Sequence, residues 1–283
     1  MTETTIQSPG RRLGRRGINP LDYLRRPWMQ LTLFLSFVFL YFPIVTLVTF
    51  SFNDSRRNIT WKGFTWKYYE KALNNDSLHD AFVNSMIVAG TSTVVSTALG
   101  AMLGLSLYRY RFPWKGTYEG VAHLPIVIPE ICMGVAMLVF FNAIGMDLSL
   151  ITITVSHIAF TIPFVAVVIR ARMAGFDISL EEASRDLGAS EWQTFWYVTF
   201  PYMIPGLVAG ALMAFVLSLD DFVITFFTAG VGSTTFPIKI YSMLRFSVTP
   251  EVNAASTVLI VITLSLTLVA MIMQSRWARG RQK

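Results

Sequence analysis

Residues 150–169 read LITITVSHIAFTIPFVAVVI, a stretch without Asp, Glu, Lys or Arg. A helix that crosses the hydrocarbon core of a bilayer needs about 20 predominantly apolar residues, and this stretch has that length. The sequence therefore predicts an all-α, polytopic membrane protein with about six transmembrane helices, because five more such stretches occur. They are Met29–Phe52, Phe82–Leu107, Gly120–Ile144, Pro201–Phe222 and Ala254–Met273.

Composition supports the same class, because 53% of the residues are hydrophobic and only 14% are charged. Soluble domains carry roughly a quarter charged residues. The first apolar stretch is too long for the core of a secretory signal and lacks a small-residue cleavage site after it, so we interpret it as a retained anchor. The predicted organisation is a basic N-terminal segment (1–28), a transmembrane domain (29–275) and a basic tail (276–283).

The net charge of +6 is explained by membrane topology. If the N-terminus is cytoplasmic, 16 of the 23 lysines and arginines fall on the cytoplasmic side of the predicted spans. Cytoplasmic loops of membrane proteins carry an excess of Lys and Arg. We therefore expect both termini in the cytoplasm and contact with membrane lipid, and we expect no nucleic-acid partner.

Two segments on the outer side are long enough to have a role of their own. Residues 53–80 are rich in aromatic residues, and Trp61, Trp66 and Tyr68 are candidates for docking an external partner. The alternative is an interfacial belt, because Trp and Tyr favour the headgroup level. Residues 225–251 contain several glycines and prolines, which predicts a loop with one short helix.

The cytoplasmic segment at residues 170–200 is predicted to form a rigid elbow. Ser179 followed by Glu182 has the capping-box spacing, and Ser190 followed by Gln193 repeats it. Gly188 between them suits a left-handed helix stop. Two short helices should therefore meet at this glycine, and the second should run toward Pro201 and the next span. Such an elbow suits contact with another protein.

Ionisable groups within spans are costly and mark candidate functional sites. Glu130 follows two prolines in the third span, and Asp220 and Asp221 follow Ser218 at the end of the fifth. Together these residues predict a negative substrate path that attracts cations. The alternative places the aspartates at the membrane interface, with one paired to a nearby Lys or Arg. Adjacent aspartates on a helix lie about 100° apart, so both should not face one pore.

Other residue types point to packing. The single cysteine, Cys132, can form no intrachain disulfide, and the three histidines lack metal-ligand spacing, so we expect packing or hydrogen-bonding roles for them. We predict no metal site and no catalytic residue. Glycine pairs at Gly100/Gly104 and Gly206/Gly210 have the spacing of closely packed membrane helices.

The elbow contains a recognisable motif. Glu182-Ala183-Ser184, then Gly188, then Val198, Phe200 and Pro201 resembles the EAA loop of ATP-binding-cassette importer permeases, with mild departures at 184, 198 and 200. The resemblance implies a type I importer permease whose coupling loop, at 177–201, sits in a cleft of the ATPase subunit. It assigns this contact to Glu182, Ala183, Gly188, Glu191 and Pro201. The chain has no G-x-x-x-x-G-K-[ST] loop, so we expect no cofactor on it and ATP with Mg²⁺ on the partner.

Further short segments of the sequence resemble the second permease of spermidine/putrescine importers. Among them are Ser218-Leu219-Asp220-Asp221-Phe222 and Lys239-Ile240-Tyr241-Ser242-Met243. This resemblance implies a multi-pass protein of the bacterial cytoplasmic (inner) membrane. Its partners would be ATPase subunits, a second permease, an external solute-binding protein and a polyamine. The alternatives are a permease for another small solute, or a non-transport membrane protein such as an intramembrane protease.

Overall fold

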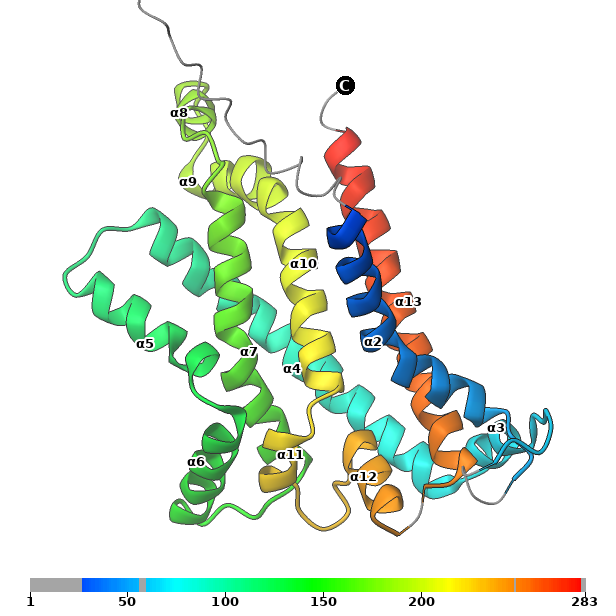
Figure 1. The fold of residues 1–283 in the computed structure, drawn as a ribbon. Helices are drawn as coiled ribbons and strands as arrows, with labels where there is room; N and C mark the ends of the chain where they lie inside the picture. Colours follow the sequence, from blue (N-terminus) through cyan, green and yellow to red (C-terminus); the bar gives the residue numbers. More distant parts are fainter. Residues whose placement is uncertain (1–26, 56–59, 247, 281–283) are drawn as a thin grey trace, which may run out of the picture. The chain divides into compact units, whose positions relative to one another are not determined.

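A computed structural model describes residues 27–55, 60–246 and 248–280 (Figure 1). Most of the predicted basic segments, at 1–28 and 276–283, lie outside these ranges or at their edge, so the side of the membrane on which the termini lie stays a prediction. The elements are helical, which confirms the predicted all-α fold. They are α2 (Pro27–Ser51), α3 (Lys67–Leu73), α4 (Asp76–Arg109), α5 (Lys115–Val127), α6 (Glu130–Ala143), α7 (Leu150–Met173), α8 (Ser179–Asp186), α9 (Glu191–Thr194), the π-helical turn η1 (Phe195–Thr199), α10 (Phe200–Leu219), α11 (Val223–Thr228), α12 (Phe236–Phe246) and α13 (Pro250–Gly280).

The membrane-length helices agree with the predicted spans. Five are long and apolar enough to cross a bilayer, and the bent pair α5–α6 makes a sixth. One of the five is continuous through α9, η1 and α10, over Glu191–Leu219. The chain divides into two compact units, Met1–Thr49 and Phe50–Lys283. Most of α2 belongs to the first unit, and the other elements form the second.

The third predicted span, Gly120–Ile144, is broken rather than continuous. Helices α5 and α6 meet at an angle of 105°. The break falls at Ile128 and Pro129, whose backbones are extended (ψ 132° and 136°). A residue before proline is pushed out of the helical region, because the proline ring collides with its backbone. Pro129 thereby stops α5 at Val127 and allows α6 to begin at Glu130.

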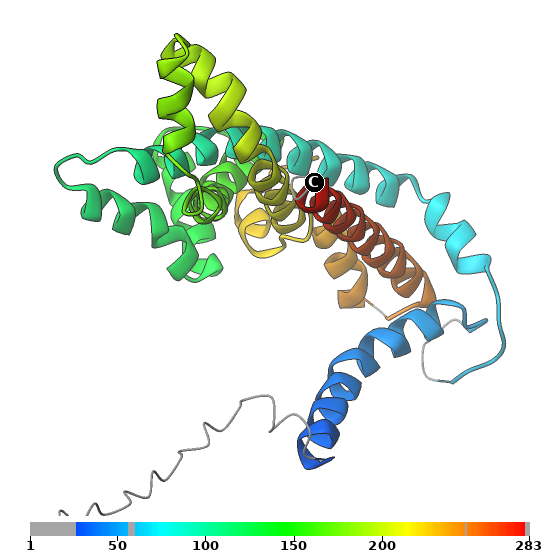
Figure 2. The ribbon, with the colours of Figure 1, turned by 90° about the horizontal axis from the view of Figure 1, so that it is seen from above.

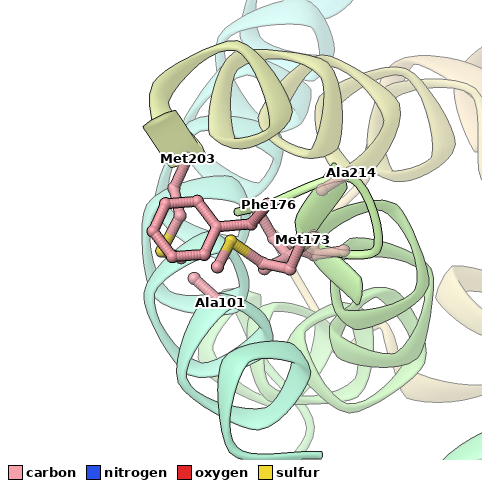
Figure 3. Close-up of a cluster of buried hydrophobic side chains, with 7 residues drawn as sticks. Ala101, Met173, Phe176, Met203 and Ala214 are labelled. Carbon is pink, nitrogen blue, oxygen red and sulfur yellow. The ribbon is translucent and has the colours of Figure 1, made fainter. Parts of the chain in front are cut away.

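The core of the second unit lies where α4, α7 and α10 pack together, as the two views show (Figures 1 and 2). Its buried apolar side chains come from these helices and the segment that follows α7 (Figure 3). They are Ala101, Val165, Ile169, Met173, Phe176, Met203 and Ala214.

The predicted close packing of the glycine pairs is confirmed. A Cβ added at Gly104 would lie 2.6 Å from the backbone oxygen of Ala166, and one at Gly100 would lie 2.6 Å from Cβ of Val165. Gly206 and Gly210 approach Arg172 and Val165 in the same way. Small residues on α4 and α10 therefore allow both helices to lie directly against α7.

The opposite end of the unit from α8 holds α3, α11 and α12 (Figure 1). Residues 225–251 contain the predicted short helix, which is α12, and a loop before it, but they also contain most of α11, which was not predicted. The turn residues of this segment connect the helices. Phe236 packs with Leu78 and Ala255 in a second buried cluster. Glu251, at the start of α13, accepts from Asn75 and pairs with Lys71 at 2.6 Å.

Candidate coupling loop and translocation path

The first helix of the elbow, α8, begins at Ser179 but is not capped as predicted. The residue before it, Ile178, is helical and makes no side-chain cap, so the predicted capping box of Ser179 and Glu182 is wrong. Asp177 acts instead, because its Oδ1 accepts from the Ser179 amide at 3.0 Å. Hydrogen bonds from Ser179 hold the pKa of Asp177 below its usual value. A carboxyl with a lowered pKa stabilises the folded form at neutral pH, and this contribution is lost as the pH falls through the lowered pKa.

The turn and the second helix of the elbow follow the prediction. Gly188 has a φ of +88°, the left-handed conformation that glycine adopts without strain. The Ser190 hydroxyl then accepts from the Gln193 amide, and the Gln193 side chain accepts from the Ser190 amide at 2.8 Å. Helix α9 continues through η1 into α10, so the elbow is joined directly to a span.

The two glutamates of α8 lie in different surroundings. Glu182 of the motif is exposed, whereas Glu181 is 5% exposed. Glu181 lies against Arg109, Arg185 and Thr199, which come from α4, α8 and η1. Nothing in the local sequence marks Glu181 as a functional residue, because its principal partner, Arg109, is 72 positions away in the chain.

The exposed face of the elbow carries apolar side chains. Leu180, the second residue of α8, is 50% exposed, and Leu187, directly after the last residue of α8, is 89% exposed. Of the predicted coupling residues, Ala183, Gly188 and Glu191 are exposed together with Glu182, and Pro201 is half-buried in the first turn of α10. The exposed residues of the elbow therefore include two leucines as well as the predicted coupling residues.

The acidic residues divide into exposed and buried groups. Asp220 follows the last residue of α10 and is exposed, and Glu130 is exposed as the first residue of α6. Helix α6, which begins at Glu130, packs against α11, whose Thr225 amide donates to Asp221. Of the three acids predicted to line the path, Asp220 and Glu130 are therefore exposed and Asp221 is buried, and the shared path stays a prediction.

Asp221 is buried and caps α11. Its carboxylate accepts from the Thr225 amide at 2.8 Å, from the Thr225 hydroxyl at 2.7 Å and from the Ile224 amide at 3.3 Å. Nε2 of His157 lies 3.2 Å from it. The expectation that adjacent aspartates face different directions is thus confirmed.

Ser218 belongs to the same buried network. Its hydroxyl lies 3.0 Å from the Ser92 hydroxyl on α4 and 2.7 Å from Nδ1 of His157 on α7. His157 is 1% exposed and also contacts the Thr225 hydroxyl at 2.9 Å, which confirms its predicted hydrogen-bonding role. The network, comprising Ser92, His157, Ser218, Asp221 and Thr225, joins α4, α7, α10 and α11.

Two of the three candidate docking residues in the aromatic segment are exposed. Trp61 and Trp66 are 48% and 61% exposed. Tyr68 is buried, and its hydroxyl donates to the carbonyl of Ser55 at 2.6 Å. Tyr68 therefore holds the segment together, and we leave it out of the candidate docking surface. In the described residues, no group of three His, Cys, Asp or Glu side chains could hold a metal ion.

Comparison with known proteins identifies the family to which the chain is similar. Residues 96–283 match the family described as "Binding-protein-dependent transport system inner membrane component". The spermidine/putrescine transport system permease protein PotC of Haemophilus influenzae is 38% identical over 244 residues, covering 86% of this chain and 93% of that protein. The putrescine transport system permease protein PotI of Escherichia coli is 36% identical over 250 residues, covering 86% of this chain and 89% of that protein.

Solved structures show the same fold at low identity. A chain in the crystal structure of a bacterial ABC transporter involved in the import of the acidic polysaccharide alginate has a TM-score of 0.71 and 17% identity, covering 90% of this chain and 96% of that one. A chain of the MetNI methionine transporter has a TM-score of 0.61 and 20% identity, covering 70% of this chain and 95% of that one. With its membrane-length helices, its elbow and these relatives, the chain belongs to the inner membrane permease components of binding-protein-dependent ABC importers.

Proposed function

We propose that this permease conducts polyamines such as putrescine and spermidine into the cell in a complex driven by ATP. The observation that carries the proposal is the exposure of the acids Asp220 and Glu130 in a chain 38% identical to a permease of spermidine and putrescine. Polyamines are polycations at neutral pH, so a negative region attracts them and repels anions.

The partners of the complex follow from the family and the surfaces. Two ATPase subunits, with ATP and Mg²⁺, bind the elbow through Glu182, Ala183 and the exposed leucines. A second permease completes the path. An external binding protein docks beside Trp61 and Trp66 and releases the solute.

The transport cycle is alternating access. Closure of the ATPase pair moves the elbow, and the spans then open the path to one side of the membrane at a time. Asp220 and Glu130 attract the amine weakly enough to release it. Ser218 and Asp221 act from the buried network, where they hold the ends of α10 and α11 beside the path.

Asp220→Asn is expected to lower uptake of labelled putrescine and spermidine about tenfold, because it removes the accessible charge while keeping the size of the side chain. A tenfold loss corresponds to about 1.4 kcal/mol. Uptake would be measured in cells that lack their own importer and express this chain with its partner subunits. Asp147→Asn is the matched control, since Asp147 is an exposed acid in the loop before α7.

The result that contradicts the proposal is equal uptake by the Asp220→Asn and Asp147→Asn variants at equal protein level. A wild-type complex that assembles and hydrolyses ATP but imports neither amine would also contradict it. That outcome favours an importer of the same build for another small solute.

A further inference from the structure

Glu181 is a buried acid on an otherwise exposed helix. It is 5% exposed, while its neighbours Glu182, Ala183 and Arg185 are exposed. Glutamate is almost never fully buried unless it is paired, because a carboxylate removed from water must be compensated. The side chain therefore points toward the spans, away from the surface on which the ATPase is proposed to bind.

The partners of Glu181 come from two membrane spans and its own helix. Arg109, the last residue of α4, approaches both carboxylate oxygens, with Nη1–Oε1 at 3.1 Å and Nη2–Oε2 at 2.9 Å. Such two-point contacts fix direction as well as distance. The hydroxyl of Thr199, the last residue of η1, donates to Oε1 at 2.5 Å. Arg185 adds a longer contact at 3.4 Å. We name Glu181, Arg109, Thr199 and Arg185 the Glu181 clamp.

Helix α8 needs such a clamp to move together with the spans. It follows a short segment after α7 and is separated from α9 by the left-handed Gly188. One further side-chain contact joins α8 to α9, between the Ser184 and Thr194 hydroxyls at 3.2 Å. This contact involves no charged group and reaches neither α4 nor α7. The charged contacts of Glu181 reach the ends of both α4 and the helix that continues into α10. These two helices form the core with α7.

We infer that Glu181 is a positioning residue for transport, which passes the movement of α8 to the cytoplasmic ends of α4 and α10 through Arg109 and Thr199. The inference rests on the proposed function, in which the elbow receives its movement from the ATPase. Within α8, the two glutamates then have separate tasks. Glu182 faces the partner, and Glu181 faces the spans.

The variant that tests the inference is Glu181→Gln, which keeps an acceptor for Thr199 and removes the charge that Arg109 pairs with. In purified complexes reconstituted into liposomes, amine uptake per ATP hydrolysed is expected to fall between about twofold and 30-fold, the range found for residues that modulate coupling. The ATPase should still co-purify, and the apparent melting temperature should stay within about 4 °C of wild type.

A control and a double variant separate coupling from general damage. Glu119→Gln also removes an acid from an ion pair, with Arg170 at 3.2 Å, but this pair joins α5 to α7 and does not touch α8, so uptake per ATP should not change. Arg109→Gln should act like Glu181→Gln. The double variant should be no worse than either single one, because residues that act as a pair are not additive.

A second readout does not depend on the identity of the solute. In a Cys132→Ser, Asp220→Cys background, ATP with vanadate should change the rate at which a maleimide labels position 220. Glu181→Gln should reduce that change to a third or less.

Three results would overturn the inference. One is an unchanged labelling response in Glu181→Gln. Another is loss of the ATPase or of thermal stability in that variant, which would make the clamp structural only. The third is a wild-type chain that binds no ATPase, which would remove the proposed function as well. A wild-type complex that imports no amine but keeps the labelling response would contradict only the proposal that polyamines are the solute.

Discussion

Gly104→Val is expected to prevent recovery of folded protein, because the added side chain has no space between α4 and α7. A Cβ at Gly104 would lie 2.6 Å from the backbone oxygen of Ala166 and 3.2 Å from its Cα. A backbone atom cannot rotate away as a side-chain end can, so the two helices must separate. Overpacking costs about 1–3 kcal/mol when side chains can adjust, and more is expected here. The measurement is the monodisperse fraction on size-exclusion chromatography in detergent.

Gly90 on the same helix provides the matched control. A Cβ at Gly90 would meet no atom within 4 Å, and Gly90→Val should therefore give as much monodisperse protein as wild type. Gly104→Ala should lie between the control and the valine variant. Equal recovery of Gly104→Val and Gly90→Val would show that α4 and α7 do not pack as closely as described.

Asp221→Ala is expected to lower the stability of the protein by about 3 kcal/mol, although the neighbouring Asp220→Ala should change it by no more than about 0.5 kcal/mol. The alanine leaves His157 and the first amides of α11 without the carboxylate that they contact. Unpaired buried polar groups are costly, because they have lost water and gained no substitute. Asp220 is exposed, so its removal leaves no buried group unpaired.

Thermal unfolding in detergent checks this difference, since both variants remove one aspartate. Asp221→Asn should fall between wild type and Asp221→Ala, because its amide oxygen still accepts one hydrogen bond. A larger loss of stability in Asp220→Ala than in Asp221→Ala would contradict the placement of the two residues. Together with the uptake assay, these variants separate a residue that holds the path from one that meets the solute.

Several features of the elbow could be predicted because they depend on near neighbours in the chain. Gly188 and the capping pair of Ser190 and Gln193 act within one helical turn, and the structure has them as expected. The bend of the third span also has a local signal, in Ile128 before Pro129, but the apolar length of Gly120–Ile144 by itself predicts one continuous helix. The cap of α8 shows the limit of this approach, since Asp177 two positions earlier replaces Ser179.

The sequence by itself determined the membrane class, the number of spans and the elbow, because hydrophobic length and helix capping are properties of consecutive residues. Only the tertiary structure decided which member of each acidic pair is buried. Arg109 pairs with Glu181 and not with Glu182, and His157 contacts Asp221 and not Asp220. Both partners come from other helices. A carboxylate becomes buried where a distant donor compensates its lost hydration, and that donor is brought near only by the packing of α4, α7 and α10.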